Sequence, residues 1–165
     1  MSRIGSPRFL QSFRKLGYNT GAIFREAAMK IYNEHITIQS KKPRECFDLT
    51  TQVKAAMEKS GFKDGVILVA SLHSNSAIAI NDPEPGLLED IDAWLGEIAP
   101  ARDDYKHKGR FESNAAIHMQ GMLMNQQALV PFTEGRLDLG PWQAVLYFEL
   151  DGLRPKRILV KVMGE

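Results

Sequence analysis

The sequence has one cysteine, Cys46, four histidines and no long run of apolar residues. A single cysteine excludes an internal disulfide framework and a Cys-x-x-Cys pair, and it fits a reducing compartment, so we expect a cytoplasmic protein. A membrane-spanning helix needs about 20 apolar residues, so we expect no membrane partner. The formal net charge of +1 gives no overall field that would attract nucleic acid, and any anion-binding site must therefore be local.

The short signatures of several enzyme classes are also absent. Serine and glycine form no nucleophile elbow, no glycine-rich phosphate loop precedes a helix, and no basic and aromatic stripe is present. We therefore expect no organic cofactor and no nucleic-acid partner. One local cationic group contains Arg154, Lys156 and Arg157, and we interpret it as the solvated start of the last strand rather than as a phosphate clamp.

The size and composition are typical of one globular domain. A chain of 165 residues, 44% hydrophobic and 25% charged, can bury one substantial core. Residues 1–33 are basic, and Phe9, Leu10, Phe13 and Leu16 have the spacing of one helical face. We predict that residues 1–33 form a helical N-terminal extension, with a targeting segment as the alternative, and that residues 34–165 form the domain.

Hydrophobic periodicity predicts an α+β domain in which strands predominate late. The expected strands are 36–39, 65–72, 77–80, 129–132, 142–149 and 158–162. The expected helices are a short one between Asp48 and Gly61, the clearest one at 87–98, and a short one at 114–122. The strand at 65–72 is continuously apolar and is predicted to be buried on both faces. Trp142 alternates with Ala144 and is predicted to lie on a packed face.

Histidine draws attention because its charge changes near neutral pH and its neutral ring binds metals. His35 lies in the first strand, and we interpret it as structural or surface-exposed. His73 ends a strand and precedes a cluster of small hydrogen-bonding residues. The members of this cluster are Ser74, Asn75 and Ser76.

The other two histidines also have polar surroundings. His107 lies in a polar loop. His118 follows Asn114 by four residues on a predicted helix, so Asn114 and His118 can face the same side of that helix. Three histidines with an open fourth position would form a catalytic zinc site. Since no His-x-x-x-His or His-Glu-x-x-His spacing is present, three unrelated polar residues are the alternative.

Four dispersed stretches together resemble the YjbQ-like family, whose members are assigned as secondary thiamine-phosphate synthases. They are 73–81, 104–107, 114–118 and 134–143, the last leading into 149–152. The resemblance covers residues 34–165 in the order of the family. It implies a mostly antiparallel, half-barrel-like sheet with two or three helices packed on one side, and a homotrimer with the histidines near a subunit boundary.

The resemblance also implies a function. A thiamine-phosphate synthase joins a pyrimidine diphosphate to a thiazole phosphate, so this hypothesis predicts a transferase with a phosphorylated small-molecule substrate. It assigns catalysis and a divalent metal, zinc or magnesium, to His73, His107 and His118. The same hypothesis assigns phosphate binding to Ser74, Asn75, Ser76 and Asn114. The alternatives are another metal-assisted phosphoester enzyme and a non-catalytic trimeric protein that binds a metal or anion.

Overall fold

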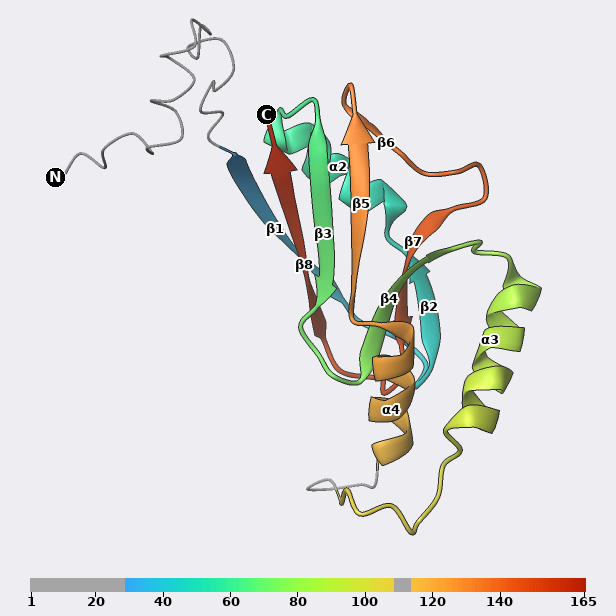
Figure 1. Ribbon diagram of the computed structural model, residues 1–165. Coiled ribbons are helices and arrows are strands. Elements are labelled where there is room, and N and C mark those ends of the chain that lie inside the picture. The colour runs from blue at the N-terminus through green and yellow to red at the C-terminus, as the bar shows by residue number, and fades with distance from the viewer. Residues whose placement is uncertain (1–28, 109–113) are drawn as a thin grey trace, which may run out of the picture.

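Eight strands and three helices form the described part of the chain, residues 29–108 and 114–165 of the computed structural model (Figure 1). The strands are β1 (Lys30–Ile38), β2 (Glu45–Asp48), β3 (Gly65–Ser71), β4 (Ser76–Asn81), β5 (Gln127–Thr133), β6 (Arg136–Leu137), β7 (Ala144–Glu149) and β8 (Lys156–Gly164). The helices are α2 (Thr50–Ser60), α3 (Pro85–Ile98) and α4 (Ala115–Met124). None of these helices is long and apolar enough to cross a membrane.

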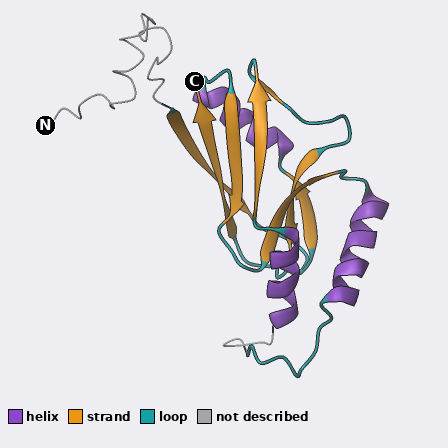
Figure 2. Ribbon diagram, viewed as in Figure 1, coloured by secondary structure: helices purple, strands orange, loops and turns teal. Residues whose placement is uncertain are grey.

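All strand pairs are antiparallel, and they form two sheets (Figure 2). The larger sheet has the order β1-β8-β3-β5-β6, and the smaller has the order β2-β7-β4. Together they make a curled, half-barrel-like arrangement in one domain, which confirms the predicted α+β fold.

Helix α2 packs inside this curl because its apolar residues recur on one face. Val53 and Met57 are fully buried against residues of both sheets, among them Val160 and Val145. The helix ends at Gly61, whose left-handed backbone (φ 72°) places its N–H on the carbonyl of Glu58 at 3.2 Å. The predicted helix between Asp48 and Gly61 is therefore present.

Strand β7 is buried on both faces because helices cover both sides of the smaller sheet. Val145 and Tyr147 belong to the α2 core, whereas Leu146 and Phe148 belong to a second cluster. Residues from α3 and α4 pack on this second cluster: Leu88, Ile91, Ile117 and Met124. Alternation along one strand thus joins two cores on opposite faces of the sheet.

The larger sheet is covered differently, which corrects the prediction that the 65–72 strand is buried on both faces. Ile67 and Val69 face α2 and are fully buried, but Val66 is 37% exposed on the other face. On the neighbouring strand β5, Leu129 is 60% exposed on that same face. The uncovered side, here called the outer sheet face, therefore carries accessible apolar side chains.

Strand β2 was not predicted, because its four residues lie within a polar stretch. It pairs with β7, and its Cys46 is partly buried. Burial raises the pKa of the Cys46 thiol to about 12, so the thiol is protonated at neutral pH. Strand β1 already begins at Lys30, and residues 1–28 of the predicted helical extension lie outside the described residues.

The predicted packed position of Trp142 is wrong. Its side chain is 75% exposed, and β7 begins only at Ala144. A turn explains the difference: the Gln143 N–H donates to the Gly140 carbonyl at 3.0 Å, while the Gln143 side chain accepts from the Gly140 N–H at 2.8 Å. This turn holds Trp142 outside the sheet.

We therefore expect Trp142→Ala to lower the free energy of unfolding by less than about 1 kcal/mol. Leu146→Ala, which truncates a fully buried side chain in the same region, should cost about 2–5 kcal/mol because it leaves a cavity. Urea titrations of the two variants and the wild type provide the measurement. Equal losses for both variants would show that Trp142 is packed.

Candidate functional site

Two of the three predicted histidines meet. The rings of His107, from the α3–α4 connection, and His118, from α4, lie edge to face with centroids 5.1 Å apart and an interplanar angle of 87°. Nε2 of His107 is 3.2 Å from Oδ1 of Asn114, the residue that precedes α4. The predicted placement of Asn114 and His118 on one side of a helix brings both to His107.

A backbone carbonyl sets the orientation of the His118 ring. Nδ1 of His118 lies 3.2 Å from the carbonyl oxygen of Ser74, in the β3–β4 loop. A carbonyl only accepts hydrogen bonds, so Nδ1 carries the proton in the neutral ring and Nε2 holds the lone pair. Nε2 has no hydrogen bond to any residue in the described ranges. It is therefore available to take a proton from a ligand.

His73 lies apart from this pair and contacts the sheet instead. Its Nε2 accepts a hydrogen bond from the backbone N–H of Arg157 at 3.0 Å, which occupies the lone pair of the neutral ring. Burial lowers the pKa of His73, and the positive charge of Lys156 lowers it further. His73 is therefore kept in the neutral form in which it can accept this bond.

The predicted three-histidine metal site is wrong. Within residues 29–108 and 114–165, no group of three or more His, Cys, Asp or Glu side chains could hold a metal ion. The physical reason is the orientation of His73, whose ring nitrogen is bonded to strand β8 and does not share a centre with His107 and His118.

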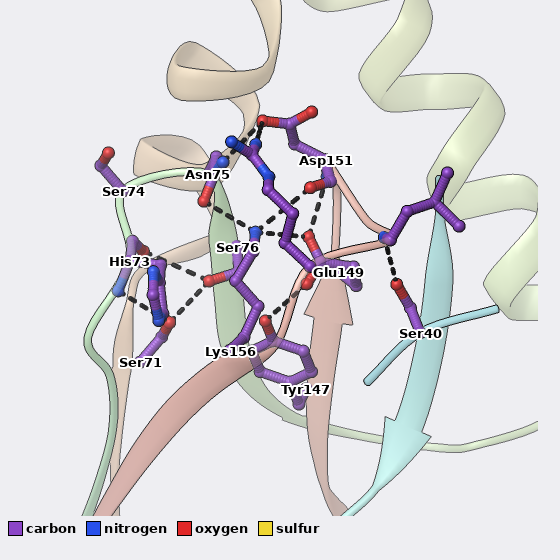
Figure 3. Close-up of polar contacts among 12 residues, drawn as sticks. Ser40, Ser71, His73, Ser74, Asn75, Ser76, Tyr147, Glu149, Asp151 and Lys156 are labelled. Carbon is purple, nitrogen blue, oxygen red and sulfur yellow. Dashed lines mark hydrogen bonds and ion pairs between the residues drawn. The ribbon is translucent and has the colours of Figure 1, made fainter. Parts of the chain in front are cut away.

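The four residues predicted to bind phosphate fall into two groups. Ser74 is exposed beside His118, and Asn114 contacts His107. Asn75 and Ser76 instead bond other protein groups: Ser76 is fully buried, and its hydroxyl lies 2.5 Å from that of Ser71. In Figure 3 the Ser74 side chain points away from the network that holds Asn75.

That network is centred on a buried ion pair that sequence reasoning missed. Nζ of Lys156 lies 2.9 Å from Oε1 of Glu149, and their side chains are 3% and 0% exposed. The same ammonium donates to Oδ1 of Asn75 at 3.0 Å and to the carbonyl of Asp151 at 3.2 Å. Its three protons thus each have an acceptor, which a buried charge requires.

Tyr147 completes the surroundings of Glu149. Its hydroxyl donates to Oε2 of Glu149 at 2.9 Å, and the Asp151 N–H donates to Oε1 at 2.9 Å. Burial raises the pKa of Tyr147, so its hydroxyl keeps the proton that it donates. The interpretation of Lys156 as part of a solvated strand start is therefore wrong, whereas Arg157 is exposed as expected.

A cavity of about 590 Å³ lies beside His118, and its open side faces solvent. Its lining comes from the ends of β3 and β5, the β3–β4 loop and α4. The lining residues are Ala70, Ser71, Ser74, His118, Met122, Asn125, Gln126 and Gln127. Hydroxyl, amide and imidazole groups provide hydrogen-bond donors, and this described lining contains no carboxylate. The cavity therefore suits a small polar or anionic ligand.

The chain belongs to the YjbQ family: a family model described as "UPF0047 protein YjbQ-like" matches residues 34–165. A UPF0047 protein of Methanothermobacter thermautotrophicus is 36% identical over 83% of this chain and 95% of its own length. The UPF0047 protein YugU of Bacillus subtilis is 29% identical over 78% of this chain and 97% of its own length. The predicted family resemblance is confirmed.

A solved structure agrees with the family assignment. A crystal structure from Sulfolobus solfataricus, described as a YbjQ-like protein of unknown function, superposes with a TM-score of 0.79 at 36% identity. The match covers 83% of this chain and 99% of that one. The shared fold therefore extends over nearly all of the relative.

The predicted function as a thiamine-phosphate synthase, and with it a transferase, is wrong. The relatives are named only as UPF0047 proteins, and the solved structure is described as being of unknown function, so nothing in the family's names supports that activity. The predicted metal-dependent alternatives lose their basis as well, because the described residues offer no metal-binding group.

The buried ion pair yields a stability prediction. Lys156→Met should lower the free energy of unfolding by about 3–5 kcal/mol, because Glu149 would be left buried without its partner. Lys161→Met is the matched control on the same strand, since within the described residues Lys161 donates only to Asn33, at 2.7 Å and near the surface. It should change stability by less than about 1 kcal/mol in the same urea titration.

The double variant Lys156→Met/Glu149→Leu checks the cause of this loss. It removes the unpaired charge together with its partner, so it should be more stable than Lys156→Met alone. A double variant less stable than Lys156→Met would show that lost packing, rather than an unpaired charge, dominates.

Proposed function

We propose that the chain binds a small phosphorylated molecule beside His118 and that the His107–His118 pair exchanges a proton with it. The observation that carries this proposal is the geometry of His118. Its Nδ1 is held by the Ser74 carbonyl at 3.2 Å, and the ring lines a polar cavity. A ring held at one nitrogen by a fixed acceptor is oriented to act as a general base at the other.

Three features support an anionic ligand. The cavity lining described above has hydroxyl and amide donors and no carboxylate that would repel an anion. His107 lies in edge-to-face contact with His118, so a bound anion would stabilise protonation of either ring. Ser74 and Asn114 lie next to these rings, where their polar groups can contact the same ligand.

Inorganic phosphate is a direct probe of this site. In a titration followed by the NMR signals of the histidine rings, we expect saturable shifts at His118 and His107. His118→Asn should raise the dissociation constant for phosphate at least about tenfold, because it removes a charge-assisted hydrogen bond worth roughly 1.5–3 kcal/mol.

His35→Asn is the matched control, because His35 is exposed on β1 and should leave phosphate binding unchanged. The proposal is wrong if the shifts do not saturate, or if His35 and His118 respond alike, since both results indicate unspecific contact with the anion.

We also propose that the chain forms a homotrimer in the cytoplasm, as the family resemblance and the single cysteine led us to expect. Exposed apolar residues on the outer sheet face support self-association. Val66, Leu129 and Ile31 are 37%, 60% and 52% exposed there. A sheet face that exposes several large apolar side chains is a candidate for burial between subunits.

Sedimentation equilibrium tests the assembly. The wild type should have three times the chain mass of 18.5 kDa. Leu129→Lys should shift it toward the monomer, because an ammonium would be buried without a partner. Trp94→Lys, at an exposed position of helix α3, is the control and should leave the trimer intact. A monomeric wild type would overturn this part of the proposal.

A further inference from the structure

The amide of Asn75 is fixed at both ends. Its Oδ1 accepts from Nζ of Lys156 at 3.0 Å, and its Nδ2 donates to Oδ2 of Asp151 at 2.7 Å (Figure 3). A lysine ammonium only donates, so the orientation of the amide is determined by its partners. Arg154 donates to the same Oδ2 of Asp151, at 2.6 Å.

The partner that holds Asn75 is itself immobilised by burial. Lys156 is bonded to Glu149, and the same Glu149 oxygen accepts the N–H of Asp151. The ammonium and the carboxylate are almost inaccessible to solvent. Moving either one would leave a buried charge without acceptors or donors, so this network resists displacement.

Ser74 lies between two anchored residues. On one side, His73 accepts from the Arg157 N–H, and its carbonyl accepts from the hydroxyl of Ser76 at 3.2 Å. On the other side is Asn75. Helix α4 also lies directly on this loop: a Cβ added at Gly121 would come within 3.2 Å of the Ser74 carbonyl oxygen. The carbonyl that orients His118 is therefore placed by its neighbours in the loop.

We propose that Asn75 is a positioning residue, which transmits the fixed geometry of the Lys156–Glu149 pair to the Ser74 carbonyl and so to the ring of His118. This inference rests on the proposed function in taking His118 as the acting imidazole. Asn75 itself has no role in contacting the ligand, because both ends of its amide already bond protein groups.

The consequence is a defined tautomer. With the Ser74 carbonyl in place, neutral His118 carries its proton on Nδ1, whereas a histidine ring in water prefers the proton on Nε2. If the loop shifts, the Nδ1 bond weakens and the ring returns toward the solution preference. Nε2 then no longer offers a lone pair to a ligand.

Ring ¹⁵N chemical shifts of His118 at pH 8 report this tautomer directly. The wild type should have the proton mainly on Nδ1. Asn75→Ala should raise the Nε2–H fraction at least about twofold and weaken phosphate binding about fivefold, the order of one neutral hydrogen bond. A purely structural role of Asn75 would lower the melting temperature without moving the tautomer.

Two further variants make the test decisive. Asn75→Asp keeps an acceptor for Lys156 but replaces the donor to Oδ2 of Asp151 with a like charge, so it should release the loop from Asp151 and shift the tautomer in the same direction as Asn75→Ala. Asn33→Ala removes another asparagine that accepts from a lysine, Lys161, and should change neither readout. If Asn75→Ala does not fold, Asn75→Asp decides the question.

The failures of the two proposals are distinguishable. A wild-type tautomer in both folded Asn75 variants would overturn the positioning role, whatever their phosphate binding. A shifted tautomer in these variants, with no phosphate binding by the wild type, would support the positioning role and overturn the proposed function.

Discussion

The buried ion pair of Lys156 and Glu149 is the interaction on which the rest of the site depends. Glu149 ends β7 in the smaller sheet, and Lys156 begins β8 in the larger one, so the pair joins the two sheets where the chain passes between them. Burying two charges is costly unless every proton and lone pair finds a partner. Tyr147, Asn75 and the backbone of Asp151 provide those partners, and Asn75 thereby ties the β3–β4 loop to the ion pair.

Periodicity predicted much of the fold because most elements bury one face. Strand 65–72 and helix 87–98 correspond to β3 and α3. Trp142 shows the limit of this reasoning: the alternation of Ala144 and Leu146 was extended one step too far. The alternation ends at a turn in which the Gln143 side chain accepts a hydrogen bond from the Gly140 N–H. Hydropathy carries no information about that hydrogen bond.

The burial of Lys156 could have been predicted from the sequence, because Lys156 alternates in step with Ile158, Val160 and Val162 and therefore faces the core. Its charge led to the opposite interpretation. The missing information was the partner, since Glu149 is on another strand and becomes a neighbour only when the two sheets meet.

Part of the candidate site could be predicted from local periodicity, and the part that depends on contacts between distant segments could not. Helical spacing placed Asn114 and His118 on one side, and His107 joins them. The direction of the His73 ring depends on how its loop lies against β8, where the N–H of Arg157 takes its lone pair. No local pattern encodes that contact. The amides of Asn125, Gln126 and Gln127 are consecutive in the sequence and were missed because they line the cavity only once the connection from α4 to β5 lies against the end of β3, where the Ser71 N–H donates to the Gln126 carbonyl at 2.8 Å.

Asn114 occupies the N-cap position of α4, yet its side chain makes no capping bond and contacts His107 instead. Asparagine at this position commonly satisfies one of the free N–H groups of the first turn. Helix α4 therefore begins with less stabilisation than its sequence allows. The amide oxygen of Asn114, which makes no capping bond, contacts His107 in the preceding loop instead. One side chain thus sets the stability of a helix start against the placement of the His107 ring, so that selection for a more stable helix and selection for a well-placed imidazole would act on it in opposite directions.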